Sequence, residues 1–492
     1  MEQAPYKTIV GLEVHVQLAT NSKLFCRCAN RYGAPPNTLT CPVCAGLPGA
    51  LPVMNRQAYF LALRAALGLK CTIPGFTKWD RKNYFYPDLP KGFQTSQFDL
   101  PMSEHGFLEI SDPEGNFATK KIGIIRAHLE EDAGKSVHDE VAGKGDSRID
   151  LNRCGTPLLE IVSEPDLRSA EEAGVYLAEL KLLLSYLEIS DCNMQEGSLR
   201  VDANINLHIE QDGETKATPI VEVKNMNSFR AVQRALVYES QRQYEVWQET
   251  GRALGDPGVT KETRGWDDGA GITRGQRSKE ESSDYRYFPE PDLPPVVVTD
   301  AQVEEERGRL GELPAALRDR LQAEYALSPY DAGVLVNQGH LIVDYFLAIA
   351  EPLKDGKLVS NWIQQDVMRY LGENGGTIAD YPVSTKAFTQ LLQTVASGTL
   401  TTSRGREVLA RMVCECESVD EAMKALGIVE VAADETEDLC RELLAANPKV
   451  VEDLKNGKQK AVGALIGQAK QINPNVLPGQ VREICLRLAD EM

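Results

Sequence analysis

The chain has 492 residues, of which 42% are hydrophobic and 25% charged, and its formal net charge is −19. One hydrophobic core does not support that length, so we expect about three domains. The acidic balance argues against indiscriminate nucleic-acid binding, although it leaves room for local basic patches. The sequence shows neither an apolar run of transmembrane length nor a signal-peptide pattern, so we expect a cytoplasmic protein without a membrane partner.

The first predicted element is a strand in residues 8–20, TIVGLEVHVQLAT, where apolar and polar side chains alternate with a two-residue period. Its polar face carries Glu13, His15 and Gln17. For one such strand, a solvated sheet face is the simpler interpretation. The same alternation recurs in three later segments, whose polar positions are Arg126, His128, Glu130, Asp202, Asn204, Asn206, His208, Glu222 and Lys224. Because Asp and Asn are depleted in strands, four such faces together favour a sheet that faces a ligand.

A cysteine-rich segment, CRCANRYGAPPNTLTCPVC, follows the first strand and contains Cys26, Cys28, Cys41 and Cys44. A C-x-C pair and a C-x₂-C pair, separated by a loop with glycine and prolines, reach one tetrahedral ion without backbone strain. In a reducing compartment, clustered cysteines indicate a metal rather than disulfides. We therefore predict a closed, structural zinc site over residues 26–44.

The polar strand faces also predict a site for a hard metal ion. Glu13 and His15 lie at positions i and i+2 of one strand, roughly 6–7 Å apart, so they converge on one ion. We add Glu130, Glu160 and Asp202 and predict that all five surround one divalent cation. Carboxylates with a single imidazole suit Mg²⁺ or Mn²⁺ better than Zn²⁺, and Mg²⁺ held in this way takes phosphate oxygens as further ligands.

Basic and amide side chains near these strands are candidates for holding phosphate groups. Any one of them, taken singly, is better explained as a surface group. The candidates are Lys82, Lys135, Arg153, Asn204, Lys224, Asn225, Asn227, Lys279 and Arg286. The sequence has no Walker loop, no kinase glycine loop and no GxGxxG motif, so a nucleotide site here is not of a common type.

Helical periodicity replaces strand alternation after about residue 300. The prolines between Pro289 and Pro295 continue neither a helix nor a central strand, so they mark a boundary. A second break is expected near SGTLTTSRGR. We therefore predict an α+β protein with an antiparallel-sheet cradle domain over 1–295, an all-α domain over 296–404 and a helical tail domain over 405–492.

Several long motifs occur in order along the first 295 residues: GLEVHVQL, DRKNYFYPDLPKGFQTSQFD, HLEEDAGKS, DLNRCGTPLLEIVSEPD, GSLRVDANIN, VKNMNSF and DYRYFPEPDLPP. With these motifs the chain closely resembles the GatB family, the B subunits of aspartyl/glutamyl-tRNA amidotransferases. Residues 451–470, VEDLKNGKQKAVGALIGQAK, resemble the C-terminal tail domain of that family. The four cysteines resemble those of its zinc-bearing members, and some relatives lack them, so a catalytic zinc is not expected.

The resemblance implies a reaction in two steps. ATP phosphorylates the side-chain carboxylate of Glu on tRNA(Gln) or of Asp on tRNA(Asn), and ammonia then attacks the acyl phosphate. The ammonia comes from an amidase, the A subunit, and the complex is completed by a small C subunit. Because this chain shows no amidase or glutaminase signature, we expect no glutamine hydrolysis from it alone.

The resemblance also implies roles for the residues singled out above. It implies catalytic roles for Glu13, His15, Lys82, Glu130, Lys135 and Arg153. It implies that ATP is bound by Asn204, Lys224, Asn225, Asn227, Lys279 and Arg286. The polar face of the first strand is then the metal-holding wall of a kinase-like site.

Two other classes of function stay open at this point. A zinc-containing tRNA-binding module without chemistry of its own predicts no ATP turnover, even with partners and substrate tRNA present. A metallohydrolase that uses Glu13, His15 and Glu130 predicts turnover without ATP. The sequence also leaves open whether Glu-tRNA(Gln), Asp-tRNA(Asn) or both are substrates.

The predicted tail domain contains a local basic segment in this acidic chain. Five lysines against Glu452 and Asp453 give it a net charge of +3. The lysines are Lys449, Lys455, Lys458, Lys460 and Lys470. Without the resemblance, a solvated helix face is the simpler interpretation; with it, we expect the tail to contact tRNA through phosphates and shape.

Overall fold

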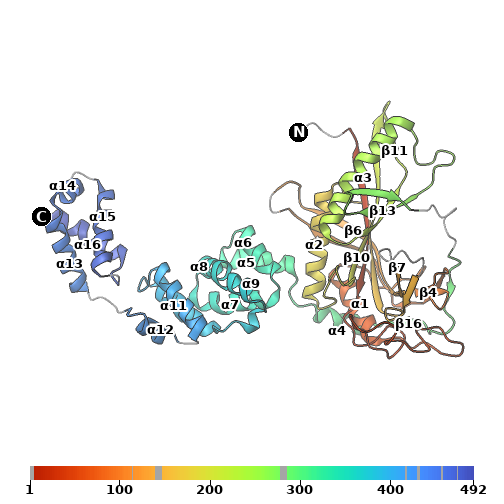
Figure 1. The fold of residues 1–492 in the computed structure, drawn as a ribbon, viewed down its shortest axis with the longest axis horizontal. Helices are drawn as coiled ribbons and strands as arrows, with labels where there is room; N and C mark the ends of the chain where they lie inside the picture. Colours follow the sequence, from red (N-terminus) through yellow and green to blue (C-terminus); the bar gives the residue numbers. More distant parts are fainter. Residues whose placement is uncertain are drawn as a thin grey trace. The chain divides into compact units, whose positions relative to one another are not determined.

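The computed structural model divides the chain into two compact units, Met1–Ala316 and Leu317–Met492 (Figure 1). The described residues are 5–112, 115–138, 147–276, 285–415, 418–428, 433–455, 458–473 and 475–491. The predicted fold class, α+β with a strand-rich first part and helices after it, is confirmed. The finer division at residues 295 and 404 stays a prediction.

A nine-stranded sheet organises the first unit. β1 (Lys7–Gln17) lies inside it, between β9 (Pro157–Ser163) and β10 (Leu199–Gln211). Beyond β9 the sheet continues with β6 (Lys120–Glu131) and β5 (Glu104–Ile110). Beyond β10 it continues with β12 (Val221–Met226), β13 (Glu262–Asp267) and β14 (Ile272–Gly275), while β11 (Glu214–Ala217) also pairs with β10.

One strand pair of this sheet departs from the predicted antiparallel arrangement. β12 and β13 run parallel, whereas the other pairs of the sheet are antiparallel. The physical reason is α3 (Phe229–Thr250), which connects the two strands. A crossover helix returns the chain to the starting edge of the sheet, so the next strand runs in the same direction.

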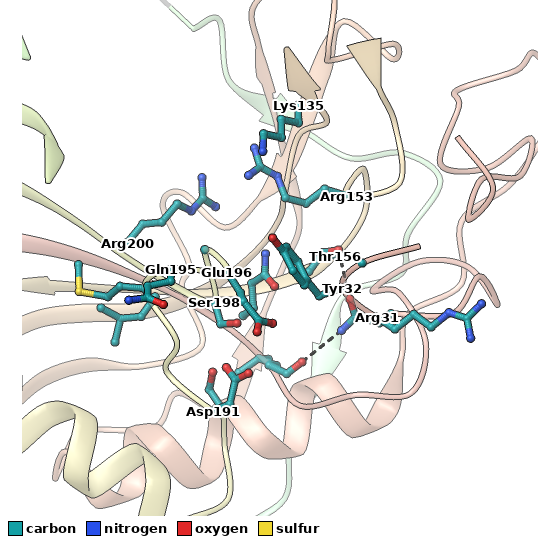
Figure 2. Close-up of a pocket in the computed structure, with 18 of the residues that line it drawn as sticks. Arg31, Tyr32, Lys135, Arg153, Thr156, Asp191, Gln195, Glu196, Ser198 and Arg200 are labelled. Atoms are coloured by element: carbon teal, nitrogen blue, oxygen red, sulfur yellow. Dashed lines mark hydrogen bonds between the residues drawn. The ribbon is translucent and has the colours of Figure 1, made fainter. Parts of the chain in front are cut away.

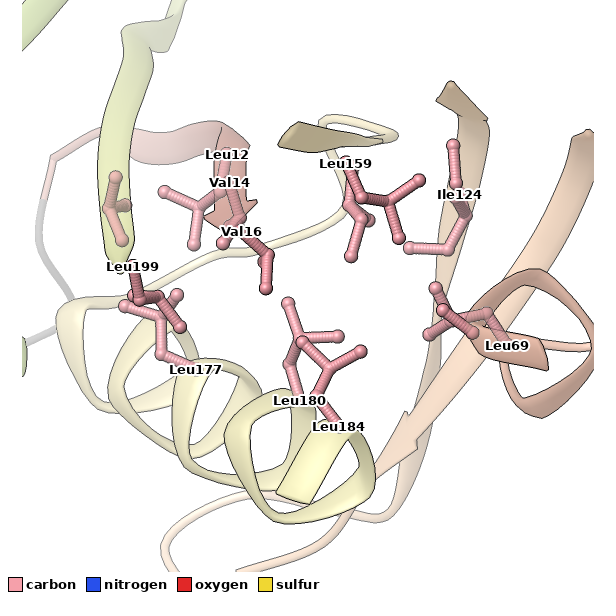
Figure 3. Packing of buried hydrophobic residues seen from close by; sticks show 14 of the residues in the cluster. Leu12, Val14, Val16, Leu69, Ile124, Leu159, Leu177, Leu180, Leu184 and Leu199 are labelled. Atoms are coloured by element: carbon pink, nitrogen blue, oxygen red, sulfur yellow. The ribbon is translucent and has the colours of Figure 1, made fainter. Parts of the chain in front are cut away.

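The apolar face of the sheet packs against helices α1 (Arg56–Gly68) and α2 (Ala170–Tyr186). Figure 3 shows the apolar side chains of β1 facing those of α2, with side chains of neighbouring strands beside them. The residues concerned include Leu12, Val14, Val16, Ile124, Leu159, Leu177, Leu180, Leu184 and Leu199. Each such buried side chain contributes about 1.5–3 kcal/mol. Because strand side chains alternate, this packing directs the polar residues of β1 to the opposite face.

Small sheets complete the first unit. β3 (Asp80–Asn83) pairs with β4 (Phe93–Ser96) and with β15 (Phe288–Pro289), and β2 (Phe76–Thr77) pairs with β16 (Val296–Val297). The proline-rich segment therefore forms short edge pairings, as its missing N–H groups require. β7 (Lys135–His138) pairs with β8 (Ser147–Asp150). Helix α4 (Asp300–Gly308) is tied to α1 by an ion pair between Arg64 and the buried Glu306.

The described residues of the second unit form helices and no strand. The first of them, α5 (Pro314–Tyr325), begins in the last residues of the first unit. The others, in chain order, are α6 (Pro329–Asn337), α7 (His340–Leu353), α8 (Gly356–Trp362), a π-helical turn (Ile363–Val367), α9 (Met368–Asn374), a 3₁₀ turn (Ile378–Asp380), α10 (Thr385–Ala396), α11 (Thr402–Glu415), α12 (Val419–Ala425), α13 (Ala433–Ala446), α14 (Pro448–Lys455), a 3₁₀ turn (Gln459–Ala461), α15 (Val462–Ile472) and α16 (Pro478–Glu491). The last four helices share an apolar cluster that includes Cys440, Leu465 and Cys485. Among the described residues, no helix combines the length and apolarity that a membrane crossing needs.

Candidate active site

The register of the sheet places polar side chains of several strands in adjacent rows. His15 lies opposite Glu160 of β9, and Glu160 lies opposite His128 of β6. One row further, Glu13 lies opposite Asp202 of β10. The polar faces recognised in the sequence therefore join into one surface across β6, β9, β1, β10 and β12.

Three residues of this surface form a first acid group: His15, Glu130 and Glu160, with one ligand atom from each within 4.8 Å of the others. Nε2 of His15 lies 3.5 Å from Oε1 of Glu130 and 3.9 Å from Oε2 of Glu160. The Glu130 side chain is 3% exposed, and its Oε2 has no hydrogen-bond partner among the described residues. Burial, reinforced by the charge of Glu160, raises the pKa of Glu130 to about 8. A buried, unpartnered carboxylate oxygen in such a group indicates a place for a cation.

His128 supports this group from β6. Its Nε2 lies 3.0 Å from Oε2 of Glu160 and hydrogen-bonds to it. Burial acts to raise the pKa of Glu160, but the charge and hydrogen bond of His128, together with the charges of His15 and Lys82, outweigh it and hold that pKa below its usual range. His128 was recognised as part of a polar strand face, yet nothing in the local pattern selected it as a site residue.

A second acid group lies beside the first and consists of Glu13, Asp202 and Glu222, again with ligand atoms within 4.8 Å of one another. Nζ of Lys224 lies 2.8 Å from Oδ2 of Asp202 and 2.8 Å from Oε1 of Glu222. Nδ2 of Asn204 donates to Oε1 of Glu13 at 2.8 Å, while the buried Oδ1 of Asn204 has no partner among the described residues. Lys224 therefore neutralises carboxylates in this group, and Asn204 orients one of them.

The five predicted metal ligands thus fall into two neighbouring groups rather than one. Glu13 and His15 are two residues apart on β1 but belong to different groups. Glu222 completes the second group and was not among the five predicted ligands, although it was recognised on the same polar strand face as Lys224. The occupancy of either group by Mg²⁺ stays a prediction.

Lys82 brings a partly buried positive charge to the first acid group. It lies on β3, and its Nζ is 5.0 Å from the ring centroid of Tyr285. Burial acts to lower the pKa of Lys82, but the charges of Glu130, Tyr287 and Glu160 outweigh it and raise that pKa above its usual value. The side chain is therefore a fixed ammonium close to the two carboxylates.

A pocket of about 1140 Å³ opens beside the acid-lined face (Figure 2). Lys135, Arg153, Asn225 and Asn227, all selected from the sequence, line it together with Arg200 and Asp202. The guanidinium of Arg153 forms an ion pair with the buried carboxylate of Asp132 at 3.1 Å. The same carboxylate forms a second ion pair with Arg200 at 2.9 Å.

Two further candidates for phosphate binding lie elsewhere in the chain. Arg286 belongs to the segment before β15, and its carbonyl oxygen accepts a hydrogen bond from Nδ2 of Asn83 at 2.8 Å. Lys279 lies outside the described residues. Both assignments stay predictions.

The four cysteines of the first unit, Cys26, Cys28, Cys41 and Cys44, have their sulfur atoms within 4.8 Å of one another. The backbone N–H of Cys41 donates to Sγ of Cys44 at 3.1 Å. A hydrogen bond from Cys26 is the largest cause that lowers the pKa of Cys44, to about 4. The fully buried Lys23 places Nζ 3.7 Å from the same sulfur. Thiolate character and a buried ammonium both fit a thiolate metal site.

The chain is similar over nearly its whole length to proteins of one family. Residues 8–304 match the family described as GatB/GatE catalytic domain, and residues 344–487 match the GatB domain. The B subunit of the aspartyl/glutamyl-tRNA(Asn/Gln) amidotransferase of Rhodopirellula baltica is 57% identical over 491 residues, covering 100% of this chain and 98% of that protein. The chain belongs to the GatB family.

Other GatB proteins cover nearly the same length. The B subunit of Thermoanaerobacter pseudethanolicus is 46% identical over 464 residues, 94% of each chain. That of Moorella thermoacetica is 45% identical over 483 residues, 97% of this chain and 98% of its own. Both acid groups, the pocket and the four cysteines of this GatB chain lie within the match to the catalytic domain.

Proposed function

We propose that this chain is the B subunit of a tRNA-dependent amidotransferase and that its acid-lined sheet face activates the substrate. It transfers a phosphoryl group from ATP to the side-chain carboxylate of Glu on tRNA(Gln), Asp on tRNA(Asn) or both. A partner amidase, the A subunit, supplies ammonia, and the complex is completed by a small C subunit. The observation that carries the proposal is the first acid group, where the buried Oε2 of Glu130 faces no partner among the described residues beside His15 and Glu160.

The chemistry explains why such a face is needed. A carboxylate is a poor electrophile, and an acyl phosphate has a leaving group. The γ-phosphoryl group moves to a carboxylate oxygen and leaves ADP; ammonia then attacks the acyl carbon, inorganic phosphate departs, and an amide remains. Phosphoryl transfer needs positioning and charge neutralisation more than covalent help from the protein.

The donor sets of both acid groups fit Mg²⁺. Carboxylate oxygens with one imidazole are hard ligands, and the unpartnered oxygen atoms of Glu130 and Asn204 leave donor capacity free. Mg²⁺ held there would supply charge neutralisation to phosphate oxygens. Within the chain, His128 keeps Glu160 ionised, Asn204 orients Glu13, and Lys82 adds a fixed positive charge beside the transferred group.

We assign the four cysteines to a structural Zn²⁺. Four thiolates close a tetrahedral site without leaving a position for substrate. Nζ of Lys23 offsets part of their negative charge and also donates to the carbonyl of Leu39 at 2.7 Å, inside the cysteine segment. The metal would therefore fix the loop between the two cysteine pairs.

The test is ADP formation by the reconstituted complex, with each misacylated tRNA and no ammonia source. We expect ADP with a misacylated tRNA and none with the same tRNA uncharged. Hydrolysis of the misacylated tRNA without ATP would support a metallohydrolase instead. Tight tRNA binding with no ATP turnover, in the presence of all partners, would reduce the chain to a binding module.

A further inference from the structure

Tyr32 is an aromatic side chain that the proposed phosphoryl transfer does not use. It lies in the loop between the two cysteine pairs, lines the pocket beside the acid groups and is 70% exposed. Figure 2 shows its ring among the side chains that line the pocket, whereas the neighbouring Arg31 points away from them. A large ring left in water at a polar pocket offers a stacking surface.

The loop that carries Tyr32 is fixed on both sides. Before it, the Asn30 side chain accepts from Oγ1 of Thr156 at 3.2 Å. After it, the backbone N–H of Asn37 donates to Asp150 at 3.0 Å, and Asn152 accepts from the N–H of Leu39 at 2.8 Å. The ring therefore stands on a preorganised loop, and a ligand that stacks on it does not have to order the backbone first.

The other lining groups define the ligand. The pocket volume of about 1140 Å³ exceeds that of a usual small-molecule site and accommodates a nucleotide with an attached amino acid. The amides of Asn225 and Asn227 offer donors and acceptors for a base or a ribose, and the exposed Lys135 offers a phosphate contact. The pocket lining also includes Asp202, a member of the second acid group.

We propose that this pocket takes the 3′-terminal nucleotide of the misacylated tRNA, with its adenine stacked on Tyr32 and its esterified amino acid directed toward Asp202. This rests on the proposed function, because the acid-lined face then acts on that amino acid. Adenine also occurs in ATP, so we compare the charge of the pocket lining with the charge that each of these two ligands carries. The pocket lining has as many acidic as basic side chains, four of each. Arg153 and Arg200 are moreover already paired with Asp132. A balanced lining suits the one phosphate of a terminal nucleotide better than a triphosphate.

The experiment compares Tyr32→Ala, Tyr32→Leu and Tyr32→Phe in the reconstituted complex. Tyr330→Ala is the matched control, since Tyr330 is 69% exposed on α6 of the second unit. Tyr32→Ala and Tyr32→Leu should raise KM for misacylated tRNA roughly 5- to 150-fold, the range that loss of one base-stacking aromatic produces. KM for ATP should not change. Tyr32→Phe and Tyr330→Ala should match the wild type.

A direct readout uses tRNA whose terminal adenine is replaced by 2-aminopurine. Its fluorescence should be quenched by the wild type and by Tyr32→Phe, and not by Tyr32→Ala. An unchanged KM for tRNA in Tyr32→Ala would overturn the proposal, and so would an equal loss in Tyr32→Phe. A rise in KM for ATP alone would place the adenine of ATP there instead. If the wild-type complex forms no ADP with misacylated tRNA, the proposed function fails, whereas the fluorescence still reports stacking.

Discussion

Replacing Glu130 with Gln separates the chemistry of the first acid group from its folding. The substitution keeps the shape of a side chain that is 3% exposed and removes a carboxyl group that can ionise on a cation and whose Oε2 has no partner among the described residues. Losing one ligand of the cation that neutralises charge in a phosphoryl-transfer site should lower kcat by about 10²–10³, or about 3–4 kcal/mol. The assay is amidation by the reconstituted complex with ATP and misacylated tRNA, over a range of Mg²⁺ concentrations.

The same substitution should not destabilise the chain in EDTA. The carboxyl has a pKa of 4.5 when unfolded and about 8 when folded, so at pH 7 folding must take up a proton. That uptake costs about 3–4 kcal/mol, because pH 7 lies 2.5 units above the unfolded pKa of 4.5 and each unit is worth about 1.4 kcal/mol. Glu130→Gln removes the cost, so its unfolding free energy should equal or exceed that of the wild type. Any gain should disappear as the pH falls to about 4, where the unfolded carboxyl is itself protonated.

Glu109→Gln is the matched control, since Glu109 is an exposed strand residue of β5 outside both acid groups. It should change neither the rate nor the stability. A near wild-type rate for Glu130→Gln at low Mg²⁺ would refute the assignment of Glu130. A loss of rate accompanied by clear destabilisation would point to a structural role instead.

Three other outcomes follow from the geometry. Cys41→Ser should release the bound Zn²⁺, measured by metal analysis, and lower the thermal stability of the first unit; a wild-type chain purified without chelator yet free of zinc would contradict this. Lys224→Met should lower the free energy of unfolding in EDTA by only about 1 kcal/mol, because the Lys224 side chain is 38% exposed and solvent screens its ion pairs. Added Mg²⁺ should restore the lost stability. Deleting residues 405–492 should weaken tRNA binding while leaving ATP binding intact, and each of Lys449, Lys460 and Lys470 changed to Ala should flatten the log–log salt slope by roughly 0.7–0.9; an unchanged slope would leave the tail a structural element.

Alternation along the strands was enough to predict which polar residues share one face of the sheet. Glu13, His15, Glu130, Asp202 and Asn204 all lie on it, because side chains of one parity share a face whatever the tertiary context. The cysteine site was equally accessible from sequence, because the spacing of short C-x-C and C-x₂-C pairs constrains the sulfur atoms locally.

What alternation could not supply was the register between strands. The pairing of His15 with Glu160, and of Glu13 with Asp202, depends on contacts between segments far apart in the chain. For that reason the five predicted ligands lie in two acid groups, and the place of Glu222 beside Glu13 and Asp202 was not predicted. The parallel pairing of β12 with β13 was missed for a related reason: it depends on where α3 returns the chain, which local pattern does not specify.

The place of β1 inside the sheet has a consequence for biosynthesis. The strand that carries Glu13 leaves the ribosome first, but Ser163, which accepts from the Leu12 N–H, follows 151 residues later, and Asn204 lies 191 residues beyond Glu13. At roughly 5–20 residues per second, β1 waits about 8–30 s with both edges unpaired, and about 10–40 s until the strand that carries Asn204 appears. A strand with one apolar face, exposed for that time, is open to wrong pairings, so the first unit should fold late in translation and depend on chaperones that shield nascent chains.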